Sequence, residues 1–285
     1  ALPASAWPSF VAAAVGKQTV MCLEAPALVA RMRGNLPAAV TALVGRDADV
    51  DTLTARLQHG DLRLLTITGP VGVGKTQLAI EVGRRLAGSY RDGAFLIELA
   101  AVRDPGLVPS AIATVLGIRE SRKGDLVQLL IDNLTARSIL LIVDNFEHLL
   151  LAAPILSSLL AGCPELRLLV TSRARLHLYG EHEYVLAPLQ LPDPEDLAAV
   201  IESPAVRLFC ARAQAARADF RLTPSLTPAV VAICRELDGL PLAIELAAAR
   251  SKLFAPNELQ QRLAQRLLVV GEGTDERQSR RLSHL

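Results

Sequence analysis

Residues 69–76 combine the residue types and the spacing of a phosphate-binding loop. They read G-P-V-G-V-G-K-T, which fits the pattern G-x-x-x-x-G-K-[ST]. The glycines let the backbone curl so that successive N–H groups point at an anion. Lys75 offers a compact positive charge to the β- and γ-phosphates, and the Thr76 hydroxyl can hold a Mg²⁺ ion that these phosphates share. The residues predicted to bind the nucleotide here are Gly69, Pro70, Val71, Gly72, Val73, Gly74, Lys75, Thr76 and Gln77.

The alternative is a glycine-rich turn that binds nothing, and the flanking sequence argues against it. Residues 62–68 form an apolar run typical of a buried strand, and residues 77–86 have the spacing of an amphipathic helix. A strand, a loop and a helix in this order are the context in which the motif binds phosphate, because the helix N-terminus adds the positive end of its dipole.

A second apolar run, residues 139–143, is followed directly by Asp144. A carboxylate at the carboxyl end of a central parallel strand faces the phosphate loop. We therefore predict that Asp144 holds the Mg²⁺ through water and completes the metal shell begun by Thr76. The alternative is an aspartate that only caps the next helix.

Two residues after this strand bear on hydrolysis. Asn145 stands where many P-loop ATPases carry a glutamate that activates water, and an asparagine can orient water but cannot take its proton. Glu147 could swing in as the base, or it could be a first-turn residue stabilised by the helix dipole. The sequence therefore predicts slow hydrolysis at most.

A third strand pattern, residues 168–171, leads into Ser172 and Arg173. Its position would bring Arg173 to the edge of the γ-phosphate, where a guanidinium can tell ATP from ADP and counter charge during transfer. The alternative is a surface arginine, since Arg175 is equally basic. The predicted catalytic group is Lys75, Asp144, Glu147 and Arg173.

Strand and helix patterns alternate from residue 62 onward, which indicates a parallel sheet covered on both faces. We predict an α/β P-loop NTPase fold with a five-stranded, mostly parallel sheet. Asp125 is a plausible N-cap, and Gly117 lies where a helix would end. The predicted strands span 62–68, 94–99, 139–143, 166–171 and 183–186. The predicted helices between them span 77–86, 107–116, 125–134 and 148–160, after one at 49–57.

The pattern changes near residue 190. Residues 191–196 (LPDPED) resemble a linker, and only helical patterns follow, with Thr227 as a cap. Those helices are predicted at 204–218, 228–237, 241–253 and 257–269. The predicted parts are an N-terminal tail or end of a preceding module (1–34), the nucleotide-binding domain (35–190), a small all-helical lid subdomain (191–270) and a frayed C-terminal tail (271–285).

Composition narrows the class of protein. The chain has 285 residues, and 51% of them are hydrophobic, which is typical of a globular protein. Its net charge of +1 gives no support for bulk electrostatic binding to nucleic acid or to an anionic membrane. Its four cysteines are isolated, which favours reduced thiols over disulfides, and its histidines show no metal-ligand spacing. The apolar stretch 10–30 is too broken to span a membrane, and a start at Ala1 favours a processed chain or a segment. We predict a cytoplasmic protein.

Five motifs taken together resemble the nucleotide-binding module of STAND ATPases, the signal-transduction relatives of the AAA+ class that include NB-ARC proteins. The resemblance covers residues 35–270 and is nearest to bacterial transcriptional regulators of the LuxR and antibiotic-regulatory type. The motifs are V-G-R at 44–46, the phosphate loop, L-I-V-D-N-F-E-H at 141–148, T-S-R at 171–173 and L-D-G-L-P-L-A-I-E-L-A at 237–247.

The resemblance implies further site residues and a mode of action. Val44, Gly45 and Arg46 would lie against the adenine, Arg173 would sense the γ-phosphate, and Pro241 would pack on the adenine from the helical subdomain. From the residues alone, 44–46 could be an ordinary helix entry and Pro241 a simple helix start. The family passes from a closed ADP-bound state to an open, oligomerising ATP-bound state. Its winged-helix histidine, repeat sensor and output domain have no counterpart in this chain.

The sequence thus predicts an ATP/ADP-binding switch module of a signal-transduction or transcription regulator, dependent on Mg²⁺, with self-association in the ATP state and no direct contact with nucleic acid. Three alternatives stay open: a remodelling ATPase of the AAA+ type with active turnover, a P-loop kinase of a small molecule, and a scaffold that no longer binds nucleotide.

Overall fold

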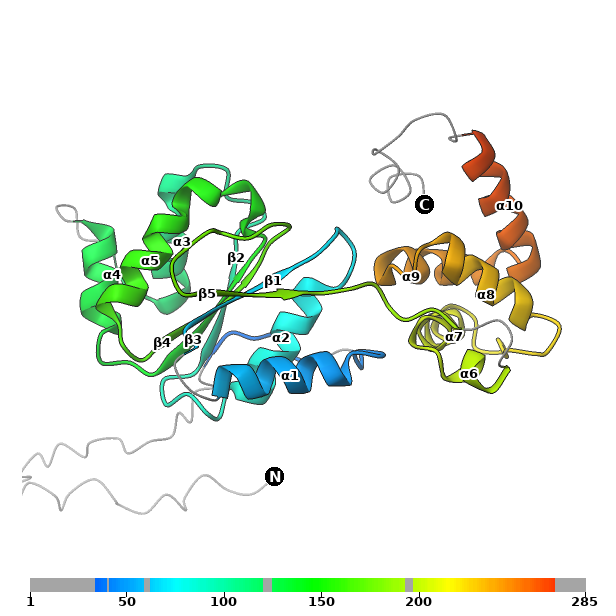
Figure 1. The fold of residues 1–285 in the computed structure, drawn as a ribbon, viewed down its shortest axis with the longest axis horizontal. Helices are drawn as coiled ribbons and strands as arrows, with labels where there is room; N and C mark the ends of the chain where they lie inside the picture. The colour runs from blue at the N-terminus through cyan, green and yellow to red at the C-terminus, as the bar shows by residue number, and fades with distance from the viewer. Residues whose placement is uncertain (1–33, 40, 59–61, 120–124, 193–196, 270–285) are drawn as a thin grey trace, which may run out of the picture. The chain divides into compact units, whose positions relative to one another are not determined.

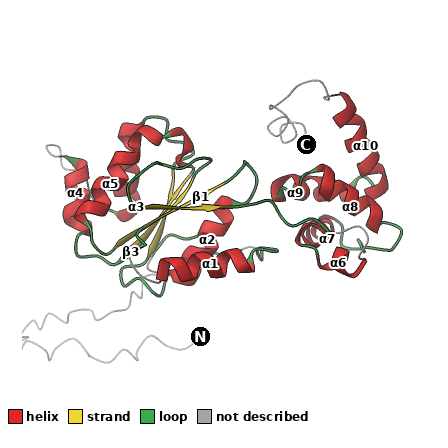
Figure 2. Cartoon of the chain, in the orientation of Figure 1, coloured by secondary structure: helices red, strands yellow, loops and turns green. Residues whose placement is uncertain are grey.

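The computed structural model describes residues 34–39, 41–58, 62–119, 125–192 and 197–269. Both predicted tails therefore lie outside the described residues, except for Gly34. Figure 1 shows a sheet flanked by helices, followed in the chain by a segment that Figure 2 shows to be helical. No helix in the described ranges is long and apolar enough to cross a membrane.

The sheet has five strands, all of them parallel, in the order β2-β3-β4-β1-β5. The predicted α/β P-loop NTPase fold is therefore confirmed. The phosphate loop follows β1, so it lies between β4 and β5 at the carboxyl ends of the strands. The strands are β1 Leu64–Thr68, β2 Ala94–Glu98, β3 Ile139–Asp144, β4 Leu166–Thr171 and β5 Glu181–Val185.

Helices cover both faces of this sheet, as its continuous apolar strands require. Alternate residues of β3 enter two separate clusters: Leu140 and Ile142 pack with α1 and α2, whereas Leu141 and Val143 pack with α3, α4 and α5. The helices of this part are α1 Asp47–Gln58, α2 Lys75–Leu86, α3 Val108–Leu116, α4 Leu126–Leu134 and α5 Ala153–Gly162. Short 3-10 turns precede α3 (Pro105–Leu107) and α5 (Phe146–His148 and Leu150–Ala152).

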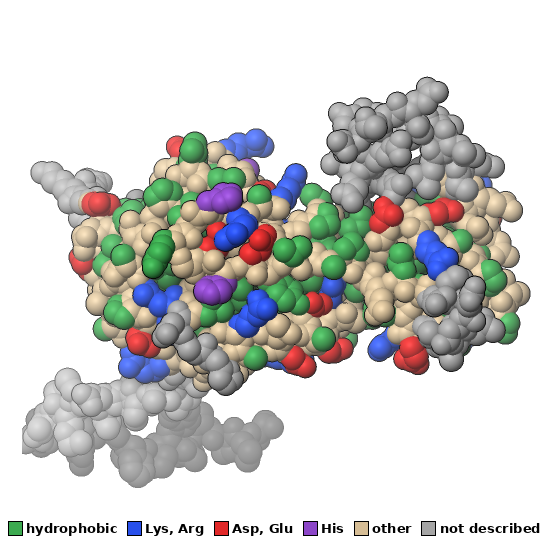
Figure 3. All heavy atoms as spheres, viewed as in Figure 1, with side chains coloured by type: hydrophobic (Ala, Val, Ile, Leu, Met, Phe, Trp, Pro, Cys, Tyr) green, Lys and Arg blue, Asp and Glu red, His purple; other side chains and the backbone are tan. Residues whose placement is uncertain are grey.

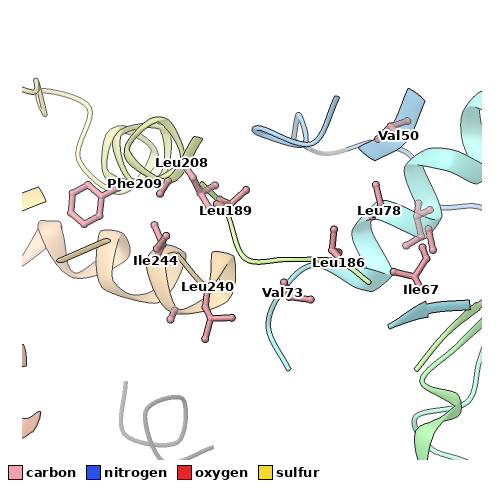
Figure 4. Close-up of a cluster of buried hydrophobic side chains, with 14 of the residues drawn as sticks. Val50, Ile67, Val73, Leu78, Leu186, Leu189, Leu208, Phe209, Leu240 and Ile244 are labelled. Carbon is pink, nitrogen blue, oxygen red and sulfur yellow. The ribbon is translucent and has the colours of Figure 1, made fainter. Parts of the chain in front are cut away.

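The first of the two clusters continues into the helical segment. Leu186 and Leu189, on the chain that leaves β5, join residues of the sheet to residues of α7, α8 and α9 in one set of buried side chains (Figure 4). The helices of this segment are α6 Leu197–Glu202, α7 Pro204–Ala216, α8 Thr227–Glu236, α9 Pro241–Ala249 and α10 Pro256–Val269, with a 3-10 turn at Arg250–Lys252.

Local signals in the sequence account for several helix ends. The Asp125 carboxylate accepts a hydrogen bond from the Val127 N–H, and Gly117 ends α3 with φ 68°, so both predictions are confirmed. Thr227 is not the N-cap, because α8 begins at Thr227 itself and its hydroxyl donates to the Thr223 carbonyl instead. Helix α6 was missed, since six residues are too few to show a period.

Two other boundaries differ from the prediction. The 148–160 helix is interrupted, and α5 begins only at Ala153, with Pro154 in its first turn. Strand β5 begins at Glu181, where it pairs with Leu64 of β1, and the buried carboxylate of Glu181 accepts the N–H groups of Leu176 and His177. A glutamate at that place hides the strand from a hydrophobicity pattern.

The segment before the first helix is fastened to the edge of the sheet by a side chain. The Asn35 amide donates to the Leu96 carbonyl at 2.8 Å and accepts from the Leu96 N–H at 2.6 Å, so it imitates a neighbouring strand beside β2. This clip covers backbone groups that an edge strand would otherwise leave open.

We expect Asn35→Ala to destabilise the fold by about 1–3 kcal/mol, because a donor and an acceptor on Leu96 lose their partners. Asn35→Asp keeps the acceptor and loses the donor, so its destabilisation should be smaller. Urea denaturation of the purified variants measures both. Equal stability of Asn35→Ala and the wild type would show that water replaces the clip.

Charged side chains are spread over the surface. On the face seen in Figure 3, Lys and Arg side chains alternate with Asp and Glu, and no large patch of a single sign is visible. This distribution agrees with the net charge of +1.

Candidate functional site

The phosphate loop has a backbone that only glycine tolerates well. Gly69, Gly72 and Gly74 have φ values of 149°, 79° and 98°, all in the region that disfavours side chains. Gly74 immediately precedes α2, which begins at Lys75. The loop thus ends at a helix N-terminus, where backbone N–H groups and the helix dipole favour an anion.

Lys75 folds back on this loop. Its Nζ donates to the carbonyls of Gly69 at 2.8 Å and Pro70 at 3.0 Å. Burial lowers the pKa of Lys75, and the charge of Arg173 lowers it further, whereas the charges of Glu147 and Asp144 raise it. The ammonium is therefore held among charged groups of both signs, and a bound phosphate would favour its charged form.

Thr76 and Asp144 meet as the sequence predicts. The Thr76 hydroxyl donates to Asp144 Oδ1 at 2.8 Å, and the Thr171 hydroxyl donates to the same oxygen at 2.5 Å. Thr171 in turn accepts from the Asn145 N–H at 3.0 Å, so the ends of β3 and β4 are joined. Asp144 is 3% exposed. The hydroxyl oxygen of Thr76 and the carboxylate oxygens of Asp144 are ligands that suit a hard cation such as Mg²⁺.

Glu147 and Arg173 form an ion pair at the carboxyl ends of β3 and β4. Arg173 Nε lies 3.1 Å from Glu147 Oε1. Glu147 Oε2 is buried and has no hydrogen-bond partner among the described residues. Asn145 has φ 62° and ψ 47°, a conformation that asparagine tolerates better than most residues, and it turns the chain into the segment that carries Glu147. An orphaned, buried carboxylate oxygen beside the loop is a group that a ligand could satisfy.

The V-G-R motif lies just before α1. Arg46 is 6% exposed, and one of its nitrogens, Nη2, donates both to the Val73 carbonyl at 3.1 Å and to the Ala187 carbonyl at 2.8 Å. Its guanidinium therefore links the phosphate loop to the chain that leaves β5. Gly45 packs on Pro204 at the start of α7, where an added Cβ would lie 2.3 Å from the proline Cβ.

Pro241 is the first residue of α9. The next residue, Leu242, donates its N–H to the Gly72 carbonyl at 3.1 Å, so this helix begins against the phosphate loop. Before it, Gly239 has φ 67° and accepts the Leu189 N–H at 2.9 Å. These contacts tie the start of α9 both to the loop and to the chain from β5.

A cavity of about 640 Å³ adjoins these motifs. The phosphate loop and α2 form one wall, residues 37–38, 41–44 and 46 another, and α7 and α9 a third. Of the predicted site residues, Val44, Arg46, Val71, Gly72, Val73, Gly74, Lys75, Thr76, Gln77, Glu147, Arg173 and Pro241 line the cavity. The other predicted site residues do not line the cavity; they are Gly45, Gly69, Pro70 and Asp144.

Several polar residues at the site were not predicted from the sequence. Thr171 was quoted only within a motif, although its hydroxyl holds the Asp144 carboxylate. Arg212 and Glu245 line the cavity from the helical segment and were not singled out. A usable signal existed for Glu245, because it lies four residues after Pro241 and therefore on the same face of a helix.

Several known proteins are similar to the chain in sequence. Residues 58–183 match the AAA domain family. The uncharacterized protein Rv0894 of Mycobacterium tuberculosis is 36% identical over 232 residues, which are 81% of this chain and 56% of that protein. The putative HTH-type transcriptional regulator Rv0890c of the same organism is 36% identical over 198 residues, 69% of this chain and 21% of the regulator. The chain thus spans about half of the first relative and a fifth of the second.

A solved structure supports the fold. It is the crystal structure of a STAND protein with a tetratricopeptide repeat sensor from Pyrococcus horikoshii. The TM-score is 0.51 at 18% sequence identity, over 81% of this chain and 34% of that protein.

Proposed function

Since the chain carries a STAND-class P-loop ATPase module, we propose that it is a nucleotide-gated switch that binds ATP and ADP with Mg²⁺ and turns ATP over slowly. The observation that carries the proposal is the shared wall of the cavity, which joins the phosphate loop to α9 and to residues 41–44 and 46. A ligand that fills this cavity contacts both the sheet and the helical segment, so its identity can set their relative arrangement.

In this proposal the phosphates bind at the N–H groups of the loop, and Lys75 exchanges its two carbonyl partners for phosphate oxygens. Thr76 and Asp144 hold Mg²⁺, which would neutralise phosphate charge when bound. Val44 to Arg46 and Pro241 enclose the adenine. Because the regulators that the chain resembles act on transcription, we also propose a cytoplasmic regulator that self-associates in its ATP state.

Slow turnover follows from the groups beside the metal site. Asn145 cannot accept a proton, and Glu147 is held by Arg173 at 3.1 Å. If a γ-phosphate drew Arg173 toward itself, Glu147 would be released and turnover would be faster. The orphaned Oε2 of Glu147 favours the second candidate, an ATPase with active turnover, because that atom could accept a proton from water.

Nucleotide analysis and phosphate release separate the two functions. If the chain is a switch, denaturing the purified protein should release ADP, and phosphate release should be well below about 1 s⁻¹, the lower end of the range typical of enzymes. Glu147→Gln should then leave ATP affinity within about twofold, since the carboxylate does not touch the loop phosphates in this proposal. Turnover above that rate, lost in Glu147→Gln, would establish the ATPase instead.

A further inference from the structure

A charged pair lies on the wall of the cavity that the helical segment provides. Arg212, on α7, and Glu245, on α9, both line the cavity. Arg212 Nε and Nη2 lie 2.9 Å and 2.8 Å from the same oxygen, Glu245 Oε1. Arg212 Nη2 also donates to the Thr41 hydroxyl at 3.3 Å. A guanidinium thus fixes the carboxylate from one side.

The other carboxylate oxygen is unused. Both guanidinium contacts end on Oε1, and no group in the described part of the chain bonds to Oε2 of Glu245. The side chain is 35% exposed, so Oε2 is open to whatever fills the cavity. A carboxylate with one oxygen occupied and the other open is an acceptor for hydroxyl groups.

The pair is not needed to hold the two helices together. Leu208 and Phe209 of α7 and Ile244 of α9 belong to the buried cluster shown in Figure 4, and they supply the apolar contact between these helices. Ion pairs that are partly exposed contribute little to stability. The packing of α7 against α9 therefore does not explain why Arg212 and Glu245 are paired on the cavity wall.

The position of Glu245 along α9 relates it to the sugar of a nucleotide. The Leu242 N–H bonds to the Gly72 carbonyl, so the start of α9 contacts the phosphate loop, and Pro241 packs on the adenine in the site proposed above. Glu245 is four residues beyond Pro241, which is about 6 Å along a helix, on the same face. The pentose joins the phosphates at the loop to the adenine at Pro241, so it would lie in the cavity that the loop, Pro241 and Glu245 line together.

Accepting the nucleotide site proposed above, we propose that Glu245, oriented by Arg212, accepts hydrogen bonds from the ribose hydroxyls and makes this module prefer ribonucleotides to 2′-deoxyribonucleotides. The vicinal hydroxyls of ribose are donors that a carboxylate binds strongly, because the acceptor is ionised. A 2′-deoxyribose leaves part of that acceptor capacity unmet.

Calorimetry of the whole chain with ATP and with dATP, each with Mg²⁺, tests the proposal. The wild type should bind ATP about tenfold more tightly than dATP, the factor expected for one charge-assisted hydrogen bond. In Glu245→Gln the ratio should fall to within about twofold, mostly through weaker ATP binding. Glu258→Gln, which breaks a comparable glutamate–arginine pair on α10 away from the cavity, should keep the wild-type ratio.

Two other outcomes overturn the proposal in distinguishable ways. If the wild type binds ATP and dATP equally, or if Glu245→Gln weakens both equally, Glu245 does not read the sugar, although the nucleotide site stands. If the wild type binds neither nucleotide, the proposed function itself fails. Thermal melting of Glu245→Gln beside Glu258→Gln shows that both variants are folded.

Discussion

Lys75→Ala is expected to lower the affinity of the chain for ATP with Mg²⁺ by about 100- to 10,000-fold. In the proposed site the ammonium would supply charge-assisted hydrogen bonds to two phosphates, and each such bond contributes about 1.5–3 kcal/mol. Alanine removes both, whereas the loop N–H groups remain. Calorimetric titration measures the loss, and affinity within about threefold of the wild type would refute the assignment of the loop.

Lys75 also bonds to the loop itself, so a control must separate the loss of phosphate contacts from a change in the empty loop. Its ammonium satisfies the Gly69 and Pro70 carbonyls when no phosphate is present, so alanine could alter the empty loop. Lys75→Met keeps the aliphatic stem and should lose affinity equally. Lys252→Ala removes a lysine from a 3-10 turn outside the cavity and should bind ATP like the wild type.

The lowered pKa of Lys75 adds a dependence on pH. Burial disfavours the ammonium in the empty site, whereas bound phosphate favours it, so binding takes up a proton wherever the free lysine has begun to lose it. Affinity for ATP should therefore fall as the pH rises through the lowered pKa of Lys75. This decline should be absent in Lys75→Met.

Gly239→Ala is expected to destabilise the protein by about 2–4 kcal/mol, a large change for a single methyl group. Two effects add. Gly239 has φ 67°, which strains alanine, and an added Cβ would lie 2.4 Å from the Leu189 carbonyl oxygen, which belongs to the backbone and cannot rotate away. The bond from the Leu189 N–H to the Gly239 carbonyl would lengthen or break as well.

Thermal melting should show the effect as a lower midpoint, by roughly 2–4 °C for each kcal/mol in a chain of this size. Gly88→Ala is the matched control, since an added Cβ there meets nothing within 4 Å and the residue has no positive φ. That variant should melt with the wild type or slightly above it. If the two variants melt alike, the turn at Gly239 accommodates a side chain by moving.

The sheet was predictable because its signal is local and simple. A strand buried on both faces is a continuous apolar run, and β3 and β4 are of this kind. Strand β5 lies at the edge of the sheet and reads EHEYV, so its first two residues, Glu181 and His182, were missed. Helix α6 was missed for a different reason: its six residues are too few to show a helical period.

The site likewise contains residues that the sequence predicts and contacts that it does not. Lys75, Thr76 and Asp144 follow from a fixed spacing within one element and from the rule that parallel strands end at one edge. The partners of Arg46 could not be foreseen, because Val73 and Ala187 accept through backbone carbonyls, which carry no sequence signal. Arg212 and Glu245 are 33 residues apart in the chain, and only the fold brings them together.

Arg46 restricts the movement of the phosphate loop relative to the chain that leaves β5. A single nitrogen of its guanidinium holds the Val73 carbonyl of the loop and the Ala187 carbonyl of the chain leaving β5. Two carbonyls that share one donor cannot move apart by more than a fraction of an ångström without losing a bond of about 1.5–3 kcal/mol. The loop and the exit of β5 therefore behave as one rigid unit, and their amide hydrogens should exchange with solvent in step.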